Sequence, residues 1–176
     1  MAMINAFRDP NLVTALQVPT GNVEGYLYPD TYRVPYGSNA GDIAAQMLTR
    51  FHAVWSPDFE RRARELGMTR HQVMTLASIV EAEARDPMER PKVAAVYHNR
   101  LRINMKLDAD PTVAYAKGGF RGHLYYKDLE LDSPYNTYRH AGLPPGPIGN
   151  PGEGAIRAAL FPDTTSHALF FVARGD

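Results

Sequence analysis

The chain has 176 residues, of which 44% are hydrophobic and 22% are charged, and this composition is ordinary for one globular domain. The 19 Lys and Arg residues balance the 19 Asp and Glu residues, so no net charge favours nucleic acid as a partner, and no basic run indicates a membrane surface. The absence of cysteine excludes disulfide bonds, thiolate zinc sites and cysteine nucleophiles.

Residues 1–23 lack strong periodicity, and we expect them to be a lead-in to the main domain. Residues 1–11 contain no charged start followed by an apolar stretch, so no signal peptide is predicted. No apolar run approaches the roughly 20 residues that a membrane-spanning helix needs. Residues 24–35 are rich in tyrosine and interrupted by glycine and proline, which is typical of short strands or extended loop.

The middle of the chain predicts a run of helices, because apolar residues recur there at helical spacing. Ser56, followed by Pro57, and Thr69 are expected to cap two of these helices. The expected helices cover residues 39–55, 57–67, 69–84, 89–103, 112–117 and 151–161.

Between residues 104 and 151 glycine and proline are frequent, and the sequence predicts a long loop region with short helices only. Residues 168–173 form an apolar run that predicts a buried strand, followed by a turn-like ending at Arg174-Gly175-Asp176. A strand in that position suggests a missing hairpin partner, so we expect the chain to be a piece of a longer protein. The fold class expected is α+β, with a helical core, short strands and a long loop region.

Two glutamates on the helix expected over residues 69–84 are candidate catalytic groups. On a helical wheel Glu81 and Glu83 border opposite edges of the apolar stripe, about 200° apart. Burial at such an edge raises a carboxyl pKa, which is what a general acid needs near neutral pH. Because they diverge, the two cannot act as a pair from one helix. The alternative is that both are boundary residues paired with Arg or Lys.

The loop region holds further candidates. Asp108 and Asp110 lie close together, and we expect Asp110, followed by Pro111, to cap the short helix rather than to act in catalysis. Residues 135–138 and 142–147 combine tyrosine, amide and proline side chains, which suit sugar rings and N-acetyl groups, or form a turn scaffold packed by tyrosines. The histidines are scattered without a zinc-binding pattern, so no metal site is predicted.

Several segments in order resemble the YceG-like (MltG) family of endolytic murein transglycosylases. They are residues 24–32 (EGYLYPDTY), 76–81 (LASIVE), 96–101 (VYHNRL), 110–113 (DPTV), 135–138 (YNTY), 142–148 (GLPPGPI) and 170–173 (FFVA). The resemblance implies that residues 24–176 are a YceG-like lytic transglycosylase catalytic domain, trimmed at its C-terminal end. The sequence departs from the family pattern at Asp108, where the family usually has glutamine.

The resemblance implies that Glu81 is the catalytic acid/base. Substrate-binding roles would then fall on Asn99, Asp110, Tyr135, Asn136, Thr137 and Tyr138, with the loop over residues 104–150 forming one wall of a glycan cleft that faces Glu81. Such enzymes cut the β-1,4 bond between N-acetylmuramic acid and N-acetylglucosamine in nascent strands, leave a 1,6-anhydro end and need no cofactor. One carboxyl can serve as acid and then as base.

The implied partners are peptidoglycan glycan strands and cell-wall synthases. The full-length bacterial protein would be anchored in the cytoplasmic membrane, with its catalytic domain on the outer side, where it would terminate glycan strands.

Three other functions compete with this interpretation. A lysozyme-like glycoside hydrolase would need a second carboxylate about 5–9.5 Å from Glu81, with Asp108 or Asp110 as candidates. A non-catalytic peptidoglycan-binding module would leave Glu81 with a structural role. An aminodeoxychorismate lyase would demand a lysine bound to pyridoxal phosphate, and no phosphate-binding context surrounds the lysines.

Overall fold

The computed structural model describes residues 10, 13–14, 21–119 and 123–172. From residue 21 onward, its helices in chain order are α3 (Ala40–Val54), α4 (Pro57–Glu65), α5 (Arg70–Glu83), α6 (Arg90–Arg102), α7 (Asp110–Ala116), the 3-10 helix η1 (Tyr126–Glu130) and α8 (Glu153–Leu160). The helices expected from the sequence are therefore confirmed, with ends that shift by at most two residues, and η1 is an addition within the long loop region.

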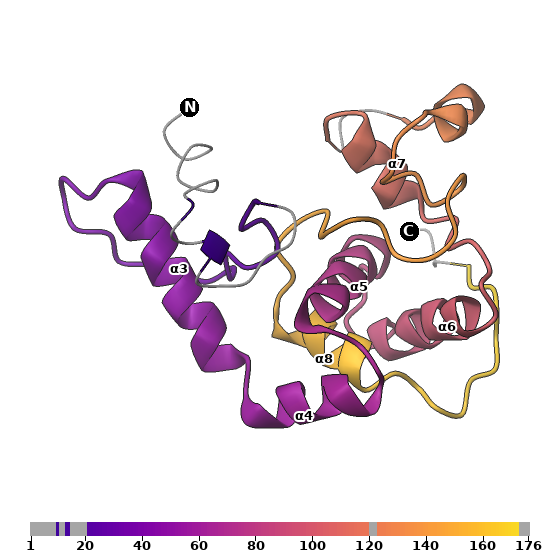
Figure 1. Cartoon of the computed structure of the whole chain (residues 1–176), viewed down its shortest axis with the longest axis horizontal. Coiled ribbons are helices and arrows are strands. Elements are labelled where there is room, and N and C mark those ends of the chain that lie inside the picture. Colours follow the sequence, from indigo (N-terminus) through magenta and orange to yellow (C-terminus); the bar gives the residue numbers. More distant parts are fainter. Residues whose placement is uncertain (1–9, 11–12, 15–20, 120–122, 173–176) are drawn as a thin grey trace.

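Helices α5, α6 and α8 pack together at the centre of the molecule, with α4 and α7 against them (Figure 1). Every residue of α5 from Val73 to Val80 is buried, so this helix is covered on all sides, as expected for the central helix of a core. Ala155, Ile156 and Ala159 of α8 are completely buried, and small side chains let two helices approach closely. The centre of the core therefore lies along α5, the helix that carries both candidate glutamates.

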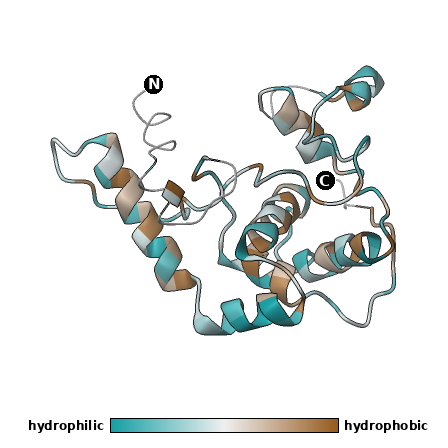
Figure 2. Cartoon of the chain, in the orientation of Figure 1, coloured by the Kyte–Doolittle hydropathy of each residue, from teal (hydrophilic) through white to brown (hydrophobic). Residues whose placement is uncertain are grey.

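Helix α3 lies to one side in Figure 1 and joins the core through aromatic side chains. The Phe51 ring packs edge-on against Tyr26, with 5.2 Å between centroids, and Trp55 packs against Phe59 of α4. Helix α4 is mostly hydrophilic in Figure 2 and buries only Phe59 and Ala63, so it covers the core from the solvent side. Val23, at the expected edge of the domain, is completely buried; a domain boundary at residue 24 stays a prediction.

Local capping explains why the central helices begin where they do. Ser56 Oγ accepts from the Phe59 amide, and Thr69 forms a reciprocal capping box with Gln72. Both caps were predicted. The prediction that Asp110 caps the following short helix was wrong: Ala109 is the N-cap of α7, and Asp110 is its first residue, without a side-chain cap bond.

The short strands expected from the sequence are not confirmed, since the described residues contain none. Residues 24–35 form turns and extended loop. Residues 168–172 are also irregular, and side chains of α6 bind their carbonyl groups in place of a neighbouring strand: Asn99 Nδ2 donates to Ala168 O at 2.9 Å, and Arg100 Nε donates to Leu169 O at 2.7 Å. An apolar run becomes a strand only where a second strand can pair with it.

Within the described part of the chain, none of the helices combines the length and the apolar character required to cross a lipid bilayer.

Candidate active site

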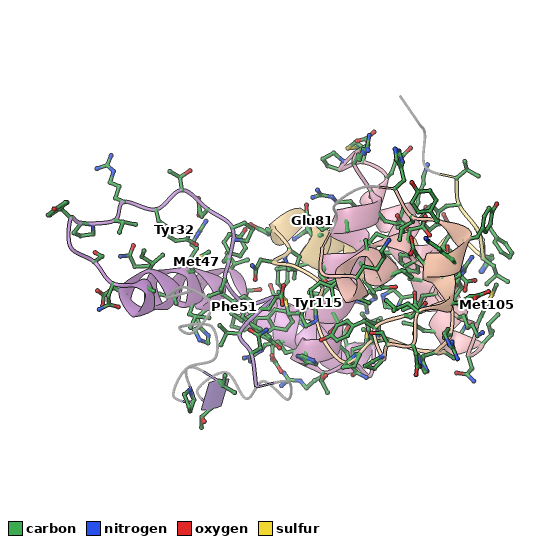
Figure 3. The ribbon with its side chains drawn as sticks, turned by 90° about the horizontal axis from the view of Figure 1, so that it is seen from above. Tyr32, Met47, Phe51, Glu81, Met105 and Tyr115 are labelled. Carbon is green, nitrogen blue, oxygen red and sulfur yellow. The ribbon has the colours of Figure 1, made fainter. Side chains whose placement is uncertain are left out.

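Glu81 lies in the last turn of α5 and presents a partly open carboxylate. Arg90 Nη2 donates to its Oε1 at 2.5 Å, and the Gly152 amide donates to its Oε2 at 2.9 Å. The side chain remains 32% exposed. In Figure 3 Glu81 stands at the junction of α5 with α8. A carboxylate held by two donors, yet open to solvent on one side, can exchange a proton with a bound substrate.

The arginine arrives through the short connection between α5 and α6. The chain leaves α5 after Glu83, turns through Asp86 and Pro87, and starts α6 at Arg90, so that the guanidinium folds back over the end of α5. Gly154 makes room for it, because a Cβ atom there would lie 2.8 Å from Arg90 Nη1. A larger residue at position 154 would push the arginine away from Glu81.

The Gly152 amide is held in place by the segment that leads into α8. The Ile148 amide donates to Ser78 Oγ on α5 at 3.0 Å. Asn150 Oδ1 accepts from the amides of Gly25 and Leu27, at 2.7 and 3.2 Å. The motif at residues 142–148 therefore runs along α5 and ends by directing the first amide groups of α8 towards Glu81, where the positive end of the helix dipole also favours a negative charge.

The motif at residues 24–32 also supports the N-terminus of α8. Gly25 has φ of 89°, and a Cβ atom there would lie 2.3 Å from Pro147, so only glycine fits. The Tyr28 hydroxyl accepts from the Glu153 amide at 3.2 Å. These residues carry the family resemblance, and in the structure they act as scaffold for the α8 N-terminus.

Glu83 faces a different environment at the other edge of α5. Its Oε1 accepts from the Tyr97 hydroxyl at 3.2 Å. Burial raises the pKa of the Glu83 carboxyl, the Tyr97 hydrogen bond opposes this, and the negative charge of Asp110 raises it further. The raised pKa expected at a stripe edge is therefore confirmed for Glu83.

Asp110 and Tyr138 meet beside Glu83. The Tyr138 hydroxyl donates to Asp110 Oδ1 at 2.6 Å, and burial together with this bond raises the tyrosine pKa. Asp110 is exposed, and Tyr138 is half-buried. Between the two glutamates Ala82 is exposed. The end of α5 therefore presents Glu81 on one side of this small residue and the group of Glu83, Asp110 and Tyr138 on the other.

Asn136 does not present its amide to a ligand in this structure. The side chain is completely buried. Its Nδ2 donates to the carbonyls of Leu129 and Leu131 at 2.9 and 2.8 Å, and its Oδ1 accepts from the Tyr138 amide at 3.0 Å. The expected cleft-lining role does not fit this geometry, because the side chain is completely buried and both of its donor hydrogens are bound to backbone carbonyls. Asn136 instead fixes the loop that carries Tyr138.

The remaining predicted binding residues are also engaged with the protein. Asn99 is buried, and its Nδ2 donates to the carbonyls of Ser166 and Ala168, at 3.1 and 2.9 Å. Thr137 is buried, and its hydroxyl accepts from the Ala109 amide and bonds to the Thr112 hydroxyl. Tyr135 is half-buried with its ring 4.8 Å from that of Tyr115. Of the residues predicted to bind substrate, the structure therefore leaves Asp110 exposed and Tyr135 and Tyr138 half-buried, whereas the other three are buried.

Sequence reasoning missed Arg90 and Gly152. A signal for Arg90 was available: the Asp86-Pro87 break, with a helix expected from residue 89, places an arginine one short turn beyond Glu81. No local signal existed for Gly152, which lies 71 residues from Glu81 in sequence. Among the described side chains, no three His, Asp or Glu residues gather in a way that could hold a metal ion.

Comparisons with known proteins agree on one family. The model of the YceG-like family matches residues 3–176. The chain is 40% identical over 157 residues to the endolytic murein transglycosylase of Bacillus subtilis (strain 168), covering 88% of this chain and 42% of that protein. It is 31% identical over 173 residues to the protein of the same name from Streptococcus pneumoniae (strain D39), covering 93% of this chain and 31% of that protein.

A crystal structure of a yceG-like protein from Listeria monocytogenes has the same fold. Its TM-score is 0.87 at 36% identity, and the match covers 97% of this chain and 60% of that one. The chain thus spans less than half of the length of the curated relatives that it matches.

Proposed function

The chain belongs to the YceG-like family, and on this premise we propose that it is the catalytic part of an endolytic murein transglycosylase, with Glu81 as the acid/base. The relatives that carry this name match nine-tenths of the chain. The observation that carries the assignment of Glu81 is its geometry, a partly open carboxylate between Arg90 and the Gly152 amide.

The reaction needs one carboxyl used twice. Protonated Glu81 gives its proton to the glycosidic oxygen while the bond to the muramyl C1 breaks, and the N-acetylglucosamine chain leaves. The resulting carboxylate then takes the proton of the muramyl O6 hydroxyl while O6 bonds to C1 and closes the 1,6-anhydro ring. Glu81 ends protonated, as it began, and no water is consumed.

Arg90 and Gly152 fit the second half of this cycle. Once the proton has left, Glu81 carries a full negative charge, and the guanidinium and the amide are already directed at its two oxygens. Donors that are fixed before charge develops stabilise it without reorganisation. Asp110 and Tyr138 are the proposed sugar contacts, whereas Asn99, Asn136 and Thr137 are positioning residues.

The test is Glu81→Gln assayed on purified sacculi. Loss of a sole acid/base should lower the cleavage rate by at least ~10²–10⁴-fold while the melting temperature stays close to that of the wild type. Glu65→Gln on exposed α4 is the matched control, and it should cleave normally. A folded Glu81→Gln protein that still cuts glycan would remove Glu81 from the mechanism.

A lysozyme-like hydrolase remains the second candidate, because one observation favours it. Glu83 has a raised pKa, and the charge of Asp110 is one of the causes; two carboxyls with unlike environments are the usual equipment of a glycoside hydrolase. This pair of Glu83 with Asp110 differs from the pair expected from the sequence, which joined Glu81 to Asp108 or Asp110. With Glu83 as the acid, Glu83→Gln would abolish cleavage and Glu81→Gln would not. If the chain is a non-catalytic binding module, the wild type, Glu81→Gln and Glu83→Gln should all bind glycan, and none of them should cut it.

For the whole protein we propose anchorage in the bacterial cytoplasmic membrane, with this part on the outer side, where it would cut nascent strands beside the cell-wall synthases. The support is the family resemblance alone. Fractionation of cells that express the full-length protein, followed by protease treatment of intact spheroplasts, tests the location: the protein should be in the membrane fraction and its catalytic part accessible to protease.

A further inference from the structure

A pocket of about 430 Å³ opens beside Asp110 and Tyr138. Its lining is Asp110, Leu124, Tyr125, Tyr126, Leu129 and Tyr138. Tyr126 is 92% exposed and Tyr125 is 61% exposed. Neither ring is buried in the core. Lys127 lies over the Tyr125 ring, with its Nζ 5.7 Å from the ring centroid, and the rest of the two rings is open to solvent.

The element that carries the two tyrosines is firmly held. Lys117 at the end of α7 pairs with Asp128 at 2.6 Å, and the Tyr125 amide donates to the same carboxylate at 2.9 Å. The buried Asn136 amide binds the Leu129 and Leu131 carbonyls. The platform η1 is therefore ordered before any ligand arrives, which lowers the entropy lost on binding.

Asp110 supplies the polar side of the pocket. Tyr138 occupies its Oδ1, and no hydrogen bond from the described residues reaches its Oδ2. A carboxylate oxygen next to aromatic faces matches a pyranose ring, which offers hydroxyl donors on its edge and C–H groups on its face. Asp110 is the charged member of the described lining, and the Lys127 ammonium lies 5.7 Å from the centroid of the Tyr125 ring. The two opposite charges beside the pocket suit a ligand without net charge.

The pocket adjoins the catalytic helix. The negative charge of Asp110 acts on Glu83, which is two residues from Glu81 in α5, and α7 packs against α5. A glycan strand lying over the exposed Ala82 at the end of α5 would thus extend from Glu81 towards the tyrosines.

We propose that this pocket is a sugar subsite that binds one neutral N-acetylhexosamine ring of the glycan strand, away from the bond that is cut, with Tyr125 and Tyr126 as the platform and Asp110 as the hydroxyl acceptor. The proposal rests on the proposed function. Its platform residues, Tyr125 and Tyr126, lie outside the motifs that carry the family resemblance, whereas Asp110 and Tyr138 lie within them.

Binding is measured in the Glu81→Gln chain, so that no turnover interferes, by calorimetry with chitohexaose, a neutral β-1,4-linked oligomer of N-acetylglucosamine. Replacing both tyrosines (Tyr125→Ala with Tyr126→Ala) should weaken the affinity by about tenfold or more. Tyr36→Ala is the matched control, because that tyrosine is fully exposed in the loop before α3, and its affinity should equal that of the parent. Equal affinities of the double variant and the control, or no binding of chitohexaose by the parent, would overturn the subsite.

Cleavage of sacculi by the chain with Glu81 intact separates this proposal from the proposed function. With both correct, the double tyrosine variant raises KM for long strands, leaves kcat nearly unchanged and still forms anhydro ends. If the double variant loses chitohexaose affinity while even the wild-type chain cuts nothing, the subsite stands and the lytic function fails. An unchanged KM together with normal cutting rejects the subsite and leaves the function intact.

Discussion

At the scale of single residues, Arg90 is the most informative addition to the candidate site. It supplies the charge that faces Glu81, and both side chains are partly shielded from water. A hydrogen bond between charged groups contributes about 1.5–3 kcal/mol. In the proposed mechanism that contribution stabilises the carboxylate formed after the first proton transfer.

Arg90→Gln should therefore lower kcat on glycan by about 10–100-fold, and Arg90→Lys should recover part of the loss because it restores the charge without the planar fork. Steady-state cleavage of uncrosslinked glycan strands measures both. Unchanged kcat in a folded Arg90→Gln protein would show that the ion pair is only structural.

Glu83 gives a prediction about pH. Its carboxyl pKa is raised by burial in the folded protein, so the folded state holds the proton more tightly than the unfolded chain does. The favourable contribution is complete below the unfolded pKa, about 4.3, and it is lost as pH rises through the folded pKa.

Glu83→Gln, which can still accept from Tyr97, should accordingly raise the melting temperature relative to the wild type at pH 7 and have a smaller effect at pH 4. Thermal unfolding at the two pH values measures this difference. A gain of the same size at both pH values would contradict a raised pKa of the Glu83 carboxyl.

At the scale of elements, η1 and the loop around Asn136 show a structural role for that residue where the sequence predicted substrate binding. The sequence predicted an amide that binds the substrate, and the structure gives that amide three partners inside the protein. Removing it would leave two carbonyls and one amide without a partner.

Asn136→Ala should lower the free energy of unfolding by about 1–3 kcal/mol or more, which urea titration can measure. A variant with wild-type stability and weakened glycan cleavage would restore the original role of Asn136 as a direct substrate ligand.

The close approach of Arg90 to Gly154 in α8 can be tested by substituting the glycine. Gly154→Ala places a methyl group 2.8 Å from the Arg90 Nη1 position, whereas Gly149→Ala meets nothing within 4 Å. We expect Gly154→Ala to displace the guanidinium and lower kcat, and Gly149→Ala to behave as the wild type. Equal activities of the two would show that the close approach does not matter.

The sequence predicts an element well when local interactions define it, and poorly when contacts with remote residues define it. Helices α3 to α6 begin at local signals such as Ser56 and Thr69, and the sequence locates them well. The run at residues 168–172 looks like a strand locally, but a strand needs a neighbour, and here Asn99 and Arg100 bind its carbonyls. The start of α7 was wrong by two residues, because Asp110 follows the N-cap instead of forming it.

At the scale of the whole molecule, the site is built from segments that are remote in sequence. Residues 24–32 and 142–152 meet through Gly25, Pro147 and Asn150, and together they bring Gly152 to Glu81. The helical wheel could nominate Glu81 and Glu83 equally, and only the family resemblance separated them. The partners of Glu81 depend on long-range packing, which no periodicity in the sequence reveals.

We propose that this chain cuts glycan by intramolecular attack of the muramyl O6 hydroxyl, with Glu81 transferring the proton. The most direct measurement is mass spectrometry of the fragments released from purified sacculi by the wild-type chain, with Glu81→Gln as the blank. We predict 1,6-anhydromuramic ends that appear with the wild type and are absent with Glu81→Gln. Fragments that carry one added water at each cut, as reducing muramic ends do, would contradict the lytic mechanism and establish a hydrolase.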